Sequence, residues 1–166
     1  MFLALGVDEE NLNEEGHNLL HSAVIYGHET TVQVILEHGA NTETRTADGA
    51  TALLLAAKCN QPEVAAVLLD NNANIEAKMP RTGQTALHIA ANLASSPDCD
   101  VENAKRLVRT LLSGGFYFGV TDNAGDTPLA LARRIEDQTR AATDILLNPP
   151  AGKFLSNVDL FSPGME

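Results

Sequence analysis

The sequence is poor in aromatic residues and in cysteine. Tryptophan is absent and aromatic residues make up only 4% of the chain, although hydrophobic residues make up 44%. Small and branched aliphatic side chains must therefore fill the core, which favours helices that pack closely through Ala and Leu. The two cysteines, Cys59 and Cys99, are too few for a disulfide framework. This usage is typical of a reducing compartment, so we expect an intracellular protein, cytoplasmic or nuclear.

Long apolar runs and basic residues are also scarce. No run of about 18 apolar residues exists, so we expect no membrane insertion. The formal net charge is −11, and the first 100 residues carry only Arg45, Lys58, Lys78 and Arg81 as cations. A nucleic-acid-binding protein needs a basic stripe for phosphates, which argues against that class. The acidic charge either favours a basic segment of a partner protein or serves only solubility.

Catalytic and metal-binding motifs are missing as well. Gly152 and Lys153 are followed by Phe154 rather than Ser or Thr, and the sequence contains neither a His-Glu-x-x-His nor a Gly-x-Ser-x-Gly motif. Residues 122–126 (DNAGD) resemble a calcium loop in composition only, because the Gly is misplaced and no Glu closes the loop. The cysteines and histidines have no zinc-site spacing. We therefore expect no enzyme, no cofactor and no metal.

What the sequence does contain is one pattern that occurs four times. Residues 83–91 read GQTALHIAA, and related starts occur at residues 16–23 (GHNLLHSA), 49–57 (GATALLLAA) and 125–132 (GDTPLALA). The glycines that open these segments lie 33, 34 and 42 residues apart. Farther along each repeat, residues 34–41 (VILEHGAN) match residues 67–74 (VLLDNNAN). This pattern resembles the ankyrin repeat family.

The resemblance implies an all-α solenoid of stacked helix-turn-helix units with short β-hairpin fingers between them. It covers about residues 3–147 and divides the chain into the tail of a truncated preceding repeat (1–10), four repeats (11–43, 44–77, 78–119 and 120–148) and a C-terminal tail or cap (149–166). Because a repeat stacked on one side only leaves an apolar face exposed, we expect either a chain cut from a longer protein or a capping element.

The third repeat is longer than the others. It has one additional residue in its finger and about nine additional residues between its helices, of which residues 94–100 look like the protruding part. Loops of this kind often carry function, so direct contact between this insertion and a partner stays open.

Capping residues stand at the predicted helix starts. Asn18, Thr51 and Thr127 precede the first helices of three repeats, and Asp98 or Asp100 precedes the second helix of the third repeat. Short polar side chains at these positions accept hydrogen bonds from free backbone N–H groups.

Two histidines recur at one position of the repeat. His21 and His88 occupy the place where the family has His, and Leu54 replaces His in the second repeat. The resemblance implies that these rings form hydrogen bonds with the backbone of neighbouring fingers, which is a structural role.

The resemblance also implies a protein–protein interaction scaffold. In ankyrin arrays the finger tips and the exposed sides of the first helices line a concave face, whose rigidity lowers the ordering cost of binding. We expect the isolated chain to be a monomer that binds another protein, and Arg81 and Arg134 can each hold a partner carboxylate through two donors. The positions carried over to this face are Glu14, Glu15, His17, Ile25, Tyr26, Arg45, Ala47, Asp48, Lys58, Cys59, Met79, Arg81, Gln84, Asn92, Leu93, Asn123, Asp126, Arg134 and Ile135.

Two alternatives stay open. The repeats are a regulatory or targeting module of a larger enzyme, channel or transcription-regulating protein, or they are a structural spacer. A fainter similarity to the inhibitor-of-NF-kappaB-like branch of the family rests on residues 83–88 with their lengthened repeat and on residues 107–111 (LVRTL) before 126–129 (DTPL).

Overall fold

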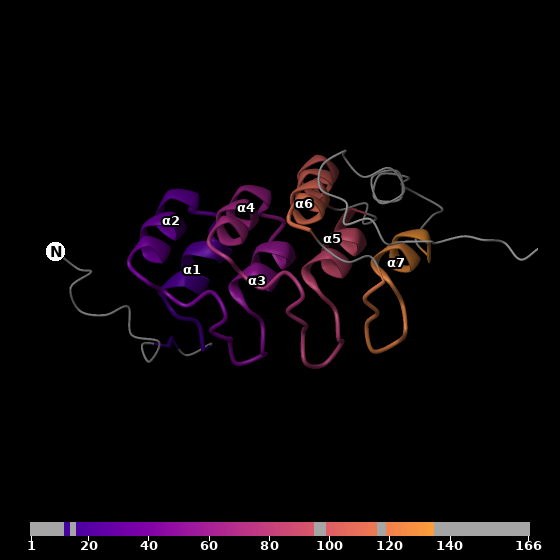
Figure 1. Ribbon diagram of the computed structural model, residues 1–166, viewed down its shortest axis with the longest axis horizontal. Helices are drawn as coiled ribbons and strands as arrows, with labels where there is room; N and C mark the ends of the chain where they lie inside the picture. Colours follow the sequence, from indigo (N-terminus) through magenta and orange to yellow (C-terminus); the bar gives the residue numbers. More distant parts are fainter. Residues whose placement is uncertain (1–11, 14–15, 95–98, 116–118, 135–166) are drawn as a thin grey trace, which may run out of the picture.

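The computed structural model describes residues 12–13, 16–94, 99–115 and 119–134. These residues form helices that stack in successive pairs (Figure 1). The pairs are α1 (Leu19–Ile25) with α2 (Glu29–Glu37), α3 (Ala52–Lys58) with α4 (Pro62–Asp70), and α5 (Ala86–Ala94) with α6 (Val101–Ser113), while α7 (Pro128–Arg134) begins a fourth unit. The predicted all-α repeat architecture is confirmed.

The helices form two rows. Each first helix packs against its own second helix and against the first helix of the next repeat, and the second helices pack against one another in the same way. Loops project from one edge of the stack, the lower edge in Figure 1, as fingers. We call them finger two (residues 44–50), finger three (78–84) and finger four (120–126). None of the described helices is long and apolar enough to cross a bilayer.

The first helices form the centre of the core. Leu20, Leu53 and Leu87 occupy the same position of successive repeats, and each is at most 1% exposed. Ala56 and Ala90 are fully buried where neighbouring first helices meet. Small residues at these contacts allow close packing, so a core with few aromatic residues is filled at high density.

The additional length of the third repeat lies mostly in its helices. α5 has 9 residues and α6 has 13, whereas α3 and α4 of the second repeat have 7 and 9. Glu63 on α4 and Arg106 on α6 form an ion pair that joins the two second helices. The part of the insertion at residues 95–98 lies outside the described residues.

The caps at three helix starts agree with the sequence. The Asn18 side chain accepts a hydrogen bond from the backbone N–H of His21 at 2.9 Å and begins α1. Asp100, rather than Asp98, caps α6 by accepting from two backbone N–H groups at 3.1 Å. Thr127 Oγ1 accepts from the N–H of Ala130 at 3.2 Å at the start of α7.

The prediction that the Thr51 side chain caps α3 with a hydrogen bond is wrong. Thr51 stands at the N-cap position of α3, but its side chain makes no capping hydrogen bond. The Thr51 hydroxyl is buried and has no partner among the described residues. In the third repeat the equivalent Thr85 hydroxyl lies 2.7 Å from Nδ1 of His88. Leu54 takes the place of that histidine in the second repeat, so the Thr51 hydroxyl lacks its acceptor.

The fingers are closed turns rather than strands, since the described residues contain no β-strand. In finger two the Thr46 N–H donates to Ala50 O at 2.9 Å. In finger three the Met79 N–H donates to Gln84 O at 2.8 Å and encloses one more residue, in agreement with the additional residue seen in the sequence.

Neighbouring fingers approach so closely that glycine is required at position 83. Gly83 of finger three has φ +69°, and a Cβ there would lie 2.8 Å from the backbone N of Asn123 in finger four. The Asn123 N–H donates to Thr82 O at 2.9 Å, and the Asn123 side chain donates to Arg81 O at 3.0 Å. These bonds fix the two fingers against each other.

Several predicted parts lie outside the described residues. They are the truncated preceding repeat (1–10), the second helix of the fourth repeat and the C-terminal tail or cap (149–166).

The orphaned hydroxyl gives a first prediction. Thr51→Val should raise the free energy of unfolding, or lower it by less than about 0.5 kcal/mol. The reason is that no hydrogen bond is lost and an unsatisfied buried hydroxyl is removed. The matched variant Thr85→Val should cost about 1 kcal/mol, because it removes the hydroxyl that pairs with His88. Urea unfolding followed by circular dichroism measures both, and equal costs would contradict this account.

The contact between fingers gives a second prediction. Gly83→Ala should destabilise the protein by about 1–3 kcal/mol more than Gly125→Ala. Both glycines have a positive φ, so both substitutions destabilise the fold by forcing alanine into a left-handed backbone conformation. At Gly125, however, a Cβ would meet no heavy atom of the described residues within 4 Å. Thermal unfolding of the two variants compares them, and an equal loss would show that the fingers are not packed tightly.

Candidate partner-binding groove

A hollow of about 390 Å³ lies between fingers two and three and the ends of α3 and α5. We call it the groove. It brings together seven of the predicted binding residues with two that the sequence reading missed, Thr82 and Ile89. The lining residues are Asp48, Lys58, Met79, Arg81, Thr82, Gln84, Ile89, Asn92 and Leu93. Ile89 precedes Leu93 by one helical turn, so this spacing was a signal from which it could have been found.

An ion pair forms one wall of the groove. Lys58 Nζ lies 2.8 Å from Oδ2 of Asp48, and the Thr46 hydroxyl also donates to the Asp48 carboxylate. The hydrogen bond from Lys58, with that from Thr46, lowers the pKa of Asp48 to about 2. Asp48 therefore stays ionised at neutral pH, and its charge is compensated within the wall.

The floor of the groove is apolar, and its rim carries a cation. Met79, Ile89 and Leu93 are half-buried and pack against the core on one side. Arg81 is exposed, and its guanidinium has no hydrogen bond or ion pair with any of the described residues. Such a surface can receive an apolar side chain and a carboxylate at the same time.

Two other cations link neighbouring fingers. Arg45 Nη1 donates to Gly49 O at 2.6 Å within finger two and to Lys78 O at 3.2 Å in the next finger. Lys78 Nζ in turn donates to Thr121 O in finger four at 2.8 Å. Arg45, which was predicted to contact a partner, thus has a structural contact as well. These bonds hold the finger side of the groove in place.

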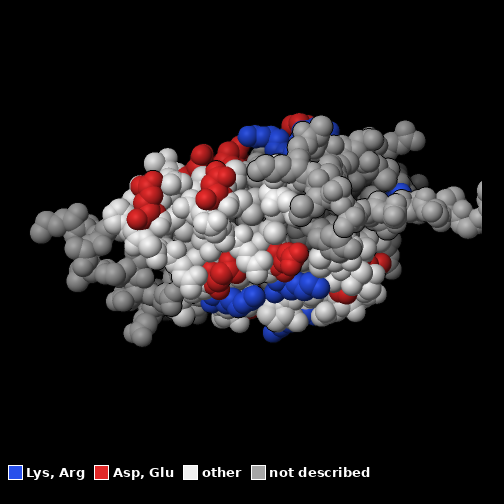
Figure 2. All heavy atoms as spheres, viewed as in Figure 1, with Lys and Arg blue, Asp and Glu red and all other residues white. Residues whose placement is uncertain are grey.

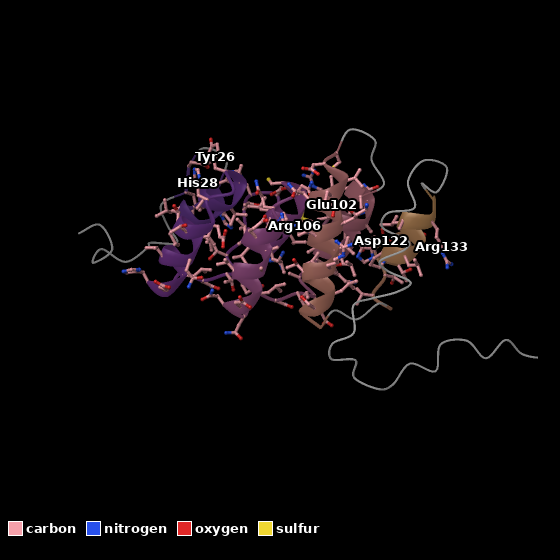
Figure 3. The ribbon with its side chains drawn as sticks, turned by 90° about the horizontal axis from the view of Figure 1, so that it is seen from above. Tyr26, His28, Glu102, Arg106, Asp122 and Arg133 are labelled. Atoms are coloured by element: carbon pink, nitrogen blue, oxygen red, sulfur yellow. The ribbon has the colours of Figure 1, made fainter. Side chains whose placement is uncertain are left out.

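The predicted residues of the first repeat lie outside the groove lining. Tyr26 is 74% exposed and stacks on His28 with the ring centroids 6.1 Å apart, at the end of the stack opposite α7 (Figure 3). The His17 ring meets the His21 ring edge-on with the centroids 6.1 Å apart, and Ile25 is half-buried against the core. Glu14 and Glu15 are outside the described residues.

The predicted residues Asn123 and Asp126 of the fourth repeat form hydrogen bonds that hold this repeat against the third. Asn123 binds the backbone of finger three, and the Asp126 carbonyl accepts from the His88 ring at 3.0 Å. Arg134 ends α7, and its side chain and Ile135 lie outside the described part of the chain. The predicted residues that line the groove therefore come from repeats two and three.

A second hollow, of about 490 Å³, lies between the C-terminal ends of α4 and α6. Its lining includes Leu69, Ile75, Thr110 and Gly114, none of which was a predicted binding residue. No sequence pattern indicated this hollow. Among the described residues, no group of three or more His, Cys, Asp and Glu side chains is placed to hold a metal ion.

The two buried histidines connect the first repeat to finger two and the third repeat to finger four. Nε2 of His21 lies 3.0 Å from Thr44 O, and Nε2 of His88 lies 3.0 Å from Asp126 O. Because a carbonyl only accepts, Nε2 carries the proton in both rings. Nδ1 of each ring faces a backbone N–H at 3.2 Å, that of Asn18 or of Thr85, and must accept. Both rings are therefore neutral, and burial lowers the pKa of each below the ordinary value.

Comparisons with known proteins agree with this architecture. A family model described as ankyrin repeats (three copies) matches residues 1–79 and 40–103. The B-cell lymphoma 3 protein homolog of Mus musculus is 35% identical over 141 residues, which are 84% of this chain and 28% of that protein.

Two plant proteins are also similar. The E3 ubiquitin-protein ligase XBAT33 of Arabidopsis thaliana is 39% identical over 120 residues, which are 72% of this chain and 22% of that protein. The E3 ubiquitin-protein ligase KEG of the same plant is 30% identical over 132 residues, 77% of this chain and 8% of that protein. The chain thus spans at most 28% of the length of these three relatives.

The neutral histidines give a third prediction. Unfolding exposes both rings and returns their pKa to about 6.5, so the unfolded chain binds more protons below that pH. Stability should be complete above about pH 7 and should fall as the pH drops toward the lowered folded-state pKa. The double variant His21→Leu, His88→Leu, which copies Leu54, should flatten this decline in the midpoint of urea unfolding. An exposed control, His28→Gln, should leave the decline intact, and an unchanged slope in the double variant would contradict the assignment.

Proposed function

Because the chain belongs to the ankyrin repeat family, we propose that it is a protein-interaction module whose groove receives a segment of a partner protein. Ankyrin repeats are generally protein-binding modules, and the groove is the surface to which we assign this function. The observation that supports it most is the set of half-buried apolar side chains, Met79, Ile89 and Leu93, which lie open beside a cation without a partner among the described residues. Apolar surface that a protein leaves accessible in a hollow is typical of a binding site.

The groove is suited to binding because its walls are already ordered. Finger three is tied to finger two through Arg45 and to finger four through Asn123. Binding of a partner therefore costs little conformational entropy in these walls. Its own side chains lose conformational freedom, and burial of apolar area against Ile89 and Leu93 offsets that loss.

A second candidate is that the repeats are the regulatory or targeting part of a longer protein. The observation in its favour is that the matched relatives, two of them ubiquitin ligases by name, are several times longer than the matched region. The groove would then recognise the substrate or partner of that longer protein. An intracellular place of action is part of both proposals, because Cys59 and Cys99 are free thiols.

The groove gives a fourth prediction. Met79→Ala combined with Leu93→Ala should weaken the binding of a partner at least about tenfold, since it removes most of the apolar floor. The matched control is Leu69→Ala combined with Thr110→Ala in the second hollow, which should bind like the wild type. Partners are captured from a cell lysate with wild-type protein, and the affinity of each purified partner is then measured by calorimetry for all three proteins.

Circular dichroism must show the same helix content in both double variants. Partners that bind the groove variant as well as the wild type would overturn the proposed site. Loss of binding only in the second pair would place recognition at the hollow between α4 and α6.

A further inference from the structure

The groove is locally positive although the chain as a whole is acidic. The four cations of the first 100 residues all lie on fingers two and three or at the end of α3. They are Arg45, Lys58, Lys78 and Arg81, and one acid of these fingers, Asp48, lies among them. In Figure 2 blue atoms lie along the finger edge of the molecule with red atoms beside them, and further blue atoms lie at the opposite edge.

Acids lie both on the second helices and beside the fingers: Glu43 and Glu76 closely precede fingers two and three, and finger four carries Asp122 and Asp126. Glu29 and Glu37 belong to α2, and Glu63 and Asp70 belong to α4. The lining of the groove itself holds Lys58 and Arg81 against Asp48, so its net charge is positive. Exposed charges are screened over about 8–10 Å at physiological salt, so a segment in the groove is affected chiefly by the charges of the lining.

These cations differ in how much of their charge is compensated. Lys58 is neutralised by Asp48 at 2.8 Å. Arg45 and Lys78 donate to backbone carbonyls, which bind the side chain but carry no net charge. Arg81 has no partner among the described residues, and its five N–H donors suit a carboxylate that accepts through both oxygens. Of these cations only Lys58 and Arg81 line the groove, so Arg81 is its one uncompensated cation among the described residues, while Arg45 and Lys78 lie beside it on fingers two and three.

We propose that the partner segment is an acidic peptide in which an apolar side chain packs on Ile89 and Leu93 while a neighbouring carboxylate pairs with Arg81. This inference rests on the proposed function of the groove and specifies its ligand. The net charge of the whole chain favours a basic segment, whereas the local charge at the groove favours the opposite sign. Arg45 and Lys78 add long-range attraction, which accelerates association and makes it sensitive to salt.

A peptide selection tests the charge of the ligand. A phage-displayed library of random peptides is selected against the immobilised chain, and enriched peptides are synthesised and measured by fluorescence anisotropy. We expect enriched peptides to combine acidic residues with an apolar residue. Their affinity should fall about tenfold in Arg81→Gln, which keeps the size of the side chain and removes its charge. It should also fall as sodium chloride is raised from about 0.05 M to about 0.3 M.

The matched control is Arg133→Gln. Arg133 is an exposed arginine on α7, at the far end of the stack from Tyr26 (Figure 3), so its loss should leave peptide affinity unchanged. Both arginine variants must keep the thermal midpoint of the wild type.

The other outcomes separate this inference from the proposed function. Enrichment of basic peptides that no longer bind the Met79→Ala, Leu93→Ala variant would overturn the acidic ligand and support the groove. Acidic peptides that bind Arg81→Gln and Arg133→Gln equally would overturn the role of Arg81. Peptides that bind the groove variant as well as the wild type would overturn the proposed function, and an absence of enriched peptides would overturn the peptide ligand.

Discussion

Successive repeats meet at their fingers over distances that leave no room for an added methyl group, and the rest of the structure depends on this contact. A Cβ on Gly16 would lie 2.9 Å from the Cβ of Ala47, and one on Gly49 would overlap the ring of Pro80. Backbone packed this closely cannot shift without separating the fingers. The spacing of the first helices, the hydrogen bonds of the buried histidines and the walls of the groove all follow from it.

The repeats stack even where the histidine hydrogen bond between them is missing. His21 and His88 connect their repeats to the next finger, while Leu54 occupies the same position in the second repeat and is fully buried. Burial of Leu54 thus takes the place of a polar bridge, at the expense of an unsatisfied hydroxyl on Thr51. The fold tolerates this because each repeat is held mainly by the apolar contacts of its two helices with the next pair.

The register of the repeat made much of this structure predictable. It located the helices, the caps at Asn18 and Asp100, and most residues of the groove, because equivalent positions about 33 residues apart have equivalent surroundings. The orphaned Thr51 hydroxyl was missed because the cap was judged by residue type, whereas its outcome depends on the neighbouring Leu54. The sign of the charge at the groove was also missed, since net charge does not say which face carries which residues.

The finger cations have two roles that are coupled through the same bonds. Arg45 and Lys78 carry positive charge beside the groove, and each also donates to the next finger, so a change of charge at either position disturbs the stack. The Arg81 side chain has no such contact among the described residues, since its link to finger four is made by its backbone carbonyl. Charge can therefore change at Arg81 with little cost in stability, because only the field at the groove changes. Differences in the partners of related arrays are then expected to arise at this kind of position, where a finger-tip side chain carries charge but makes no bond between the fingers.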